Sequence, residues 1–196
     1  MFYDLDLTLA NILEKEVAVK DLSITFAAPF GDSFISTNAP TLNLFLYDVR
    51  ENWELRSNEW LEERRDGRGY RQKPPARVDC SYMITAWAGE GGEKGVASEH
   101  ELLGEVMRVL LRHRHIPEEY LQGDLKGQEP PVRAKALHPG NLQSMGEYWQ
   151  AMGGKPKAAL NYTLTISVPL AEPEDLGPLV SETIIRLEHG VKPKPA

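Results

Sequence analysis

The chain has 196 residues, 41% of them hydrophobic and 26% charged, a balance typical of a folded globular protein rather than a fibrous or disordered one. A formal net charge of −7 argues against nonspecific binding to nucleic acid, which depends on an excess of Lys and Arg, although a local basic patch remains compatible with it. The N-terminal residues lack the features of a secretory signal, and the apolar runs are much shorter than the ~20 residues that cross a bilayer. We therefore expect assembly in the cytoplasm and no direct membrane insertion.

Apolar spacing in the first quarter of the chain predicts one helix and two strands. Asp4–Val17 has a single apolar stripe at helical spacing. Residues 22–27 form a short apolar run that ends at Pro29 and Gly31, which is typical of a strand followed by a turn. Thr41–Asn52 predicts a long strand in the centre of the sheet, because both of its faces are apolar. One face has Leu42, Leu44 and Leu46, and the other has Phe45, Tyr47 and Val49.

Residues 56–75 are dense in charge and contain Gly67, Gly69 and the pair Pro74-Pro75. We interpret this stretch as a long exposed loop. It either keeps the protein soluble or forms a contact surface for a partner, since long loops tend to be functional or disordered.

Regular alternation resumes at Ala76–Trp87, which predicts a third strand. Ser98 and Glu101 then have the spacing of a helix capping box, so a second helix should run from there to about His113.

The last third predicts a helix capped by Asn141 and ended by Gly153-Gly154, followed by a strand over Leu160–Leu170. A final short strand over Thr183–Leu187 precedes a mobile tail at 188–196. In the long strand the predicted inward residues are Leu160, Tyr162, Leu164, Ile166, Val168 and Leu170, and the outward ones are Asn161, Thr163, Thr165 and Ser167.

These elements predict an α/β (α+β) fold with a single domain over residues 1–187. We expect a central mixed or antiparallel sheet of about four to six strands and about three flanking helices.

The glycine-rich stretch Gly89–Gly95 lies between a predicted strand and a predicted helix, where phosphates are often bound. A phosphate-binding loop needs Gly-Lys followed by Ser or Thr, whereas Lys94 precedes Gly95, and Glu90 and Glu93 repel phosphate. We therefore interpret it as a flexible connection and expect no bound cofactor.

The histidines lack the spacing of a metal site. His113 and His115 are two residues apart and so point to different sides of a helix, and His100, His138 and His189 are isolated. We expect no metal ligand.

No nucleophile is indicated. The single cysteine, Cys80, excludes an intrachain disulfide and lies within a predicted strand, so we expect it to pack as a small apolar side chain. No Gly-x-Ser-x-Gly elbow occurs, and the many acidic residues are typical of a solvated surface. The sequence thus predicts no catalytic residue and no enzyme, although it leaves open a small hydrolase that uses scattered carboxylates.

Several blocks, in order, carry a family resemblance. The most distinctive is residues 42–52, which end in Arg50-Glu51-Asn52, followed by residues 54–57. The other blocks are residues 2–5, 75–79 with 82–87, 99–110 and 148–152 with 160–166. In these blocks the chain resembles the cap, or tail-terminator, proteins of extracellular contractile injection systems. It departs from their commonest pattern in the charged insertion after Ser57 and in its C-terminal segment.

The resemblance implies a structural subunit of a homo-oligomeric, hexameric ring that ends polymerisation of the inner tube and the sheath. The implied partners are the tube and sheath proteins, in a particle that is released or retained. An alternative is an adaptor that anchors the particle's end to an envelope or membrane component. A ring needs two different complementary surfaces on each subunit, and the polar face of the strand at 160–170 and the charged loop at 56–75 are the candidates.

Overall fold

The structure, a computed structural model, describes residues 1–29, 39–88, 92–137, 149–150, 153 and 156–179. Their contacts divide the chain into two compact units, described separately below. The first comprises residues 1–56 and 75–168, and the second comprises 57–74 together with the chain from 169 onward. Only residues 149–150 of the predicted helix at 141–152 are among the described residues. The predicted strand at 183–187 and the tail at 188–196 lie outside them.

The first unit is built on a five-stranded mixed sheet in the order β1-β2-β5-β7-β6. β1 is parallel to β2, and the other neighbours are antiparallel. This sheet confirms the predicted α/β (α+β) class and the expected number of strands. The bounds are β1 Ser23–Thr25, β2 Thr41–Glu51, β5 Ala76–Trp87, β6 Arg133–Ala136 and β7 Leu160–Val168.

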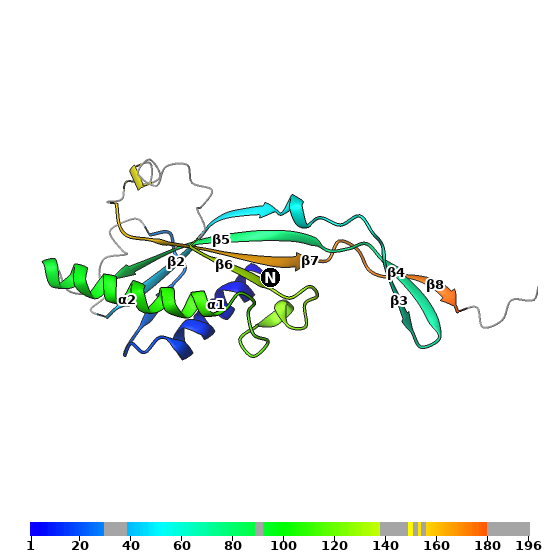
Figure 1. Cartoon of the computed structure of the whole chain (residues 1–196), viewed down its shortest axis with the longest axis horizontal. Coiled ribbons are helices and arrows are strands. Elements are labelled where there is room, and N and C mark those ends of the chain that lie inside the picture. The colour runs from blue at the N-terminus through cyan, green and yellow to red at the C-terminus, as the bar shows by residue number, and fades with distance from the viewer. Residues whose placement is uncertain (30–38, 89–91, 138–148, 151–152, 154–155, 180–196) are drawn as a thin grey trace, which may run out of the picture. The chain divides into compact units, whose positions relative to one another are not determined.

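Two helices, α1 (Phe2–Glu16) and α2 (Gly92–Arg112), pack on one face of this sheet (Figure 1). The predicted stripe of the first helix is confirmed, because Leu5, Leu9, Ile12 and Leu13 have no exposed surface. Short 3-10 helices, η2 (Trp53–Leu55) and η3 (Gly123–Leu125), follow β2 and precede β6. The strand residues in the same core are Leu42, Leu44, Cys80, Tyr82, Ile84, Ala86, Tyr162, Leu164 and Ile166.

The second helix begins earlier than its predicted capping box. α2 starts at Gly92, so Ser98 lies inside the helix and is exposed. The residue that fixes this end of the helix is Glu99, whose Oε1 accepts a hydrogen bond from the Ala88 backbone N–H at 3.1 Å. The predicted flexible connection over Gly89–Gly95 is therefore wrong for residues 92–95, which are helical.

β2 has a bulge that sequence alternation did not indicate. Leu46 pairs with Tyr82 but Asp48 pairs with Ser81, so Tyr47 is the extra residue. After it the two faces exchange, and Val49 lies opposite Cys80 rather than on the face of Phe45 as predicted. The bulge thereby brings Asp48 and Arg50 onto the face away from the helices.

β7 ends at Val168, two residues before the predicted end. Tyr162, Leu164 and Ile166 point into the core as predicted, but Leu170 is 59% exposed and belongs to the second unit. The prediction of an inward Leu170 is therefore wrong, because Pro169 supplies no backbone N–H to continue the ladder.

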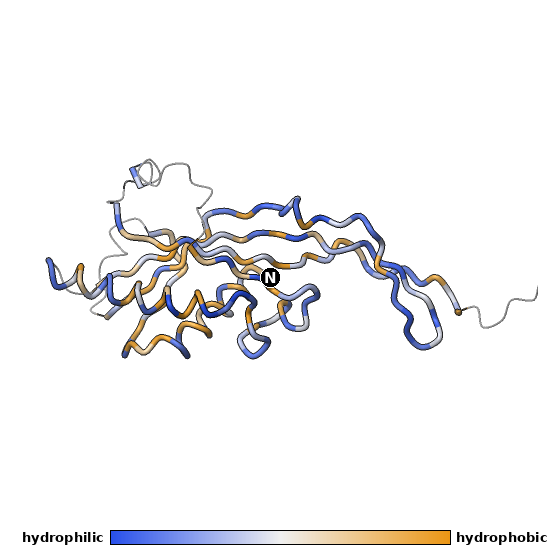
Figure 2. Tube along the Cα trace, in the orientation of Figure 1, coloured by the Kyte–Doolittle hydropathy of each residue, from blue (hydrophilic) through white to orange (hydrophobic). Residues whose placement is uncertain are grey.

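The second unit has a three-stranded antiparallel sheet in the order β3-β4-β8, with β3 Leu61–Arg65, β4 Arg68–Gln72 and β8 Glu174–Pro178. The charged stretch predicted as a loop is thus a β-hairpin, and Figure 2 shows its hydrophilic trace. Asp66 and Gly67 have φ of 52° and 74°, which is the backbone of a two-residue type I′ turn. The Asp-Gly pair was the signal for this hairpin, but the lack of apolar alternation around it concealed the strands.

Candidate functional site

The face of the five-stranded sheet that points away from the helices carries polar side chains in cross-strand rows. The register follows directly from the bulge in β2, because partners in a ladder share a face. One row is Arg50, Asp79, Thr165 and Arg133, and the next is Asp48, Ser81, Thr163 and Lys135. This polar face contains the outward residues predicted for the strand at 160–170, now joined by residues from three other strands.

Asp79 organises the first row. Its Oδ2 accepts a hydrogen bond from Asn52 Nδ2 at 2.9 Å, and its Oδ1 accepts one from Thr165 Oγ1 at 2.5 Å. Asn52 in turn accepts from the Leu55 backbone N–H at 3.2 Å, which caps η2. Both carboxylate oxygens are therefore used within the protein, and this arrangement positions the end of β2 rather than a reacting group.

Arg77 is a buried cation, with 5% of its surface exposed. Its guanidinium donates hydrogen bonds to the Pro130 carbonyl at 3.0 Å and to Ser167 Oγ at 2.5 Å. Burial lowers the pKa of Arg77, and the neighbouring charge of Arg133 lowers it further. The side chain of Gln128 closes the network by donating to the Ser167 carbonyl and accepting from its N–H, at 2.8 and 2.7 Å.

The polar face is consequently less open than predicted. Thr165 and Ser167 are only 1% and 3% exposed, and both side chains form the hydrogen bonds just described. Arg50 and Arg133 remain exposed at the margins, and Lys135 is half-buried. Sequence reasoning missed that Arg77, Asp79 and Arg133 lie on one face of the sheet, although the strict alternation of β5 already placed Arg77 and Asp79 together.

No described residue of the second unit is buried, and ion pairs cross its sheet beside the backbone ladders. Arg68 and Arg71 of β4 form ion pairs with Asp175 and Glu174 of β8, at 2.6 and 2.8 Å. The guanidinium of Arg71 also stacks on the ring of Trp60, 4.5 Å from its centroid. Five large apolar side chains of this small sheet are exposed: Trp60, Leu61, Leu170, Leu176 and Leu179. Such a sheet is typical of a surface that contacts a partner.

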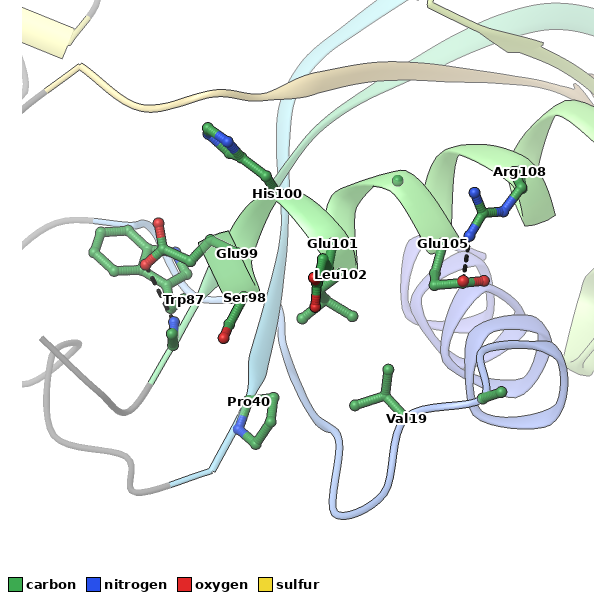
Figure 3. A pocket seen from close by; sticks show the side chains of 13 residues that line it. Val19, Pro40, Trp87, Ser98, Glu99, His100, Glu101, Leu102, Glu105 and Arg108 are labelled. Carbon is green, nitrogen blue, oxygen red and sulfur yellow. Dashed lines mark hydrogen bonds and ion pairs between the residues drawn. The ribbon is translucent and has the colours of Figure 1, made fainter. Parts of the chain in front are cut away.

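A groove of about 870 Å³ lies beside the first half of α2 (Figure 3). Val19, Pro40 and Leu102 contribute apolar surface, and Glu101 and the Glu105–Arg108 pair contribute charge. Ser98, Glu99 and His100 also line the groove, but Glu99 is engaged by the Ala88 N–H and the Lys157 ammonium, and His100 points away from Ser98 and Glu101 (Figure 3). These side chains therefore do not converge as a nucleophile, base and acid do in a catalytic site.

The other residues considered for chemistry lie apart. Cys80 is fully buried, and burial raises the pKa of its thiol to about 12, as expected of a packed cysteine. His113 Nε2 lies 2.6 Å from Glu16 Oε1. The backbone of His115 instead forms an isolated antiparallel β-bridge with Arg133, at the edge of the sheet. Among the described residues no group of three His, Cys, Asp or Glu side chains could hold a metal ion.

The Glu16 carboxylate is a structural ion-pair partner. Partial burial by itself raises its pKa, but hydrogen bonds from His113, Tyr120 and Arg112 outweigh that effect and lower the pKa overall. This cluster joins the end of α1 to the end of α2.

No helix within the described part of the chain is long and apolar enough to span a membrane.

One family model, described as the Pvc16 N-terminal domain, matches residues 4–182. The chain belongs to this family. No curated protein matches it. The fold of the chain is also similar to that of two solved structures. The sheath/tube terminator of an extracellular contractile injection system, in its extended state, has a TM-score of 0.71 and 23% identity over 97% of the present chain. The tube-terminating cap of the anti-feeding prophage has a TM-score of 0.68 and 22% identity over 95% of the chain.

The chain spans 64% and 62% of the lengths of these two proteins. At such identities the likeness establishes the fold. The match of the family model to residues 4–182 confirms the family resemblance that the ordered sequence blocks had indicated.

Proposed function

We propose that this chain is a structural subunit of the cap of a contractile injection particle, in which six copies form a ring that ends polymerisation of the inner tube and the sheath. The observation that supports this most strongly is the match of nearly the whole chain to the fold of two tube-terminating proteins.

The proposed ring requires two unlike surfaces on each subunit, because a head-to-tail contact must close on itself. The polar face is suited to one such contact, since its centre is fixed by the Asp79 and Arg77 networks while Arg50 and Arg133 remain accessible. Termination then follows from asymmetry between the two ends of the ring. One end reproduces the docking surface of the tube, and the opposite end offers no surface on which another ring can assemble.

We propose strand addition as the route to the sheath, in which an extended arm joins an exposed sheet edge. The β3-β4-β8 sheet is suited to this contact because its outer strand β3 is exposed along its whole length. The segment at 188–196 is the other candidate arm. Deleting residues 188–196 should then yield uncapped or overlong particles, and fully capped particles of normal length would remove this segment from the contact.

The decisive experiment is electron microscopy of particles produced without this chain and after complementation. Overlong or ragged tubes that return to normal length on complementation would support termination. Tubes of normal length that are no longer attached to the cell envelope would contradict it and favour the adaptor role. We further propose that assembly takes place in the cytoplasm, which fractionation of cells before particle release would test.

A further inference from the structure

Among the described residues of the second unit, β3 is an exposed edge strand of the sheet. All five of its residues are exposed, and its neighbour in the sheet order lies on one side only. The other edge strand, β8, is less suited to pairing, because Pro178 has no backbone N–H and the ladder is irregular between Gly69 and Tyr70. β3 is therefore the edge that can accept another strand.

The turn determines which backbone groups of β3 are available. In a two-residue type I′ hairpin the flanking residues, here Arg65 and Arg68, form a closing pair that exchanges both backbone hydrogen bonds. The pattern alternates along the strand, so the N–H and C=O groups of Leu61, Glu63 and Arg65 point toward β4. Those of Glu62 and Arg64 point outward, away from the sheet.

The side chains of β3 are complementary to a copy of themselves. We consider two β3 strands that lie antiparallel and are joined through the outward N–H and C=O groups of Glu62 and Arg64. Glu62 of each copy then faces Arg64 of the other copy. Glu63 then lies opposite Glu63 at the centre, and each is flanked by the Arg65 residues of both copies, with Arg65 already paired to Glu63 within one strand at 3.2 Å. The opposed Glu63 carboxylates repel each other, but the two Arg65 guanidiniums on the same face offset this repulsion, and the net charge of each face of the joint sheet is zero.

We propose that two free copies of this chain pair antiparallel through β3, centred on Glu63. The biological role of this dimer rests on the proposed function. Before the particle assembles, a second copy covers the same β3 edge that receives an arm in the particle. Pairing about a two-fold axis uses the β3 edge of each copy and therefore stops at two copies. An exposed edge without such a partner can associate with further chains without limit. Five residues per strand form a small interface, so the dimer is weak and sensitive to salt.

Cysteine cross-linking tests the register directly. Opposed residues at a site without backbone hydrogen bonds have their Cβ atoms close enough for a disulfide, and Glu63 is the only β3 residue that faces itself. The variant Glu63→Cys should form a disulfide-linked dimer at least about tenfold faster than Leu61→Cys or Arg65→Cys, whose partners in this register are each other. The native Cys80 is buried and does not compete. Similar rates for all three variants, or no dimer from Glu63→Cys, would overturn the proposal.

Charge reversal supplies a second readout by sedimentation of the protein with its natural Cys80. Glu62→Arg or Arg64→Glu alone should weaken the dimer about tenfold, because each places two like-charge pairs in the joint, and the double variant should restore it. Failure of the double variant to restore pairing would overturn the register. Failure of this dimer and failure of the proposed function are distinguishable. Sedimentation of the free protein tests the dimer, whereas the length of particles in electron microscopy tests the proposed function.

Discussion

The ammonium of Lys157 lies 2.7 Å from Oε1 of Glu99. The same ammonium stacks on Trp87, 3.9 Å from the ring centroid, and both charged side chains are less than one fifth exposed. Three segments distant in sequence thus meet at this point: the end of β5, the first part of α2 and the chain that enters β7.

Replacing Lys157 with Met should lower the free energy of unfolding by about 1–2 kcal/mol, because it removes both the ion pair and the cation–π contact while keeping the length of the side chain. Denaturant unfolding measures the change. Lys94→Met is the matched control, since Lys94 is an exposed lysine on α2, the helix that carries Glu99. Equal effects of the two substitutions would show that the contact seen for Lys157 contributes no stability.

Tyr82 donates a hydrogen bond to Asp6 Oδ1 at 2.8 Å. Burial raises the pKa of Asp6, and this hydrogen bond partly offsets the rise. An acid with a raised folded-state pKa binds more protons folded than unfolded, so its contribution to stability is full below the ordinary value of 3.8 and is lost as pH rises through the folded value.

Asp6→Asn should therefore flatten the loss of stability that begins near pH 3.8, when unfolding is measured from pH 3 to 8. Tyr82→Phe should instead lower stability at pH 7 by about 1–2 kcal/mol, because it leaves the half-buried carboxylate without its donor. An Asp6→Asn profile that runs parallel to that of the natural protein would contradict this assignment.

Arg77→Met should destabilise the first unit by about 2–4 kcal/mol, because it removes the donor to Ser167 Oγ and leaves the Pro130 carbonyl with only the 3.4 Å hydrogen bond from Ser167 Oγ. Arg50→Met is the control, since its side chain is 61% exposed and its pair with Asp48 is accordingly weak. Thermal or denaturant unfolding distinguishes the two, and comparable losses would mean that burial of Arg77 is not what stabilises the fold.

Gly67→Ala should weaken the β3-β4 hairpin selectively, because φ of 74° is costly for a residue with a side chain. Hydrogen exchange should accelerate over residues 61–72, with no change in the strands of the first unit. Gly104→Ala is the matched control: Gly104 lies inside α2 with open space around an added Cβ, so this change should stabilise the protein by about 0.5–1 kcal/mol. Equal protection of the hairpin before and after Gly67→Ala would refute the role of the turn.

Alkylation of Cys80 should report unfolding of the first unit. With the thiol buried and its pKa raised to about 12, labelling at pH 8 should be slow in the folded protein and should accelerate in step with denaturant unfolding. Rapid labelling of the folded protein would show that the thiol is accessible.

The sequence by itself determined the elements with strong periodicity. The stripe of α1, the bounds of β5 and the inward residues of β7 up to Ile166 follow from spacing alone, since burial of one face repeats with the period of the backbone. The ordered blocks along the chain also indicated the family, because each block preserves a local pattern that does not depend on distant contacts.

Only the tertiary structure decided how these elements combine into surfaces. The bulge at Tyr47 exchanges the faces of β2, and no local pattern distinguishes an extra residue from regular alternation. The network of Arg77, Asp79 and Asn52 joins residues whose proximity depends on strand register. The charged hairpin forms a sheet with β8, more than 100 residues later, whose carboxylates pair with Arg68 and Arg71. Strand pairing is set by long-range contacts, and those are the contacts that a local reading of the chain does not contain.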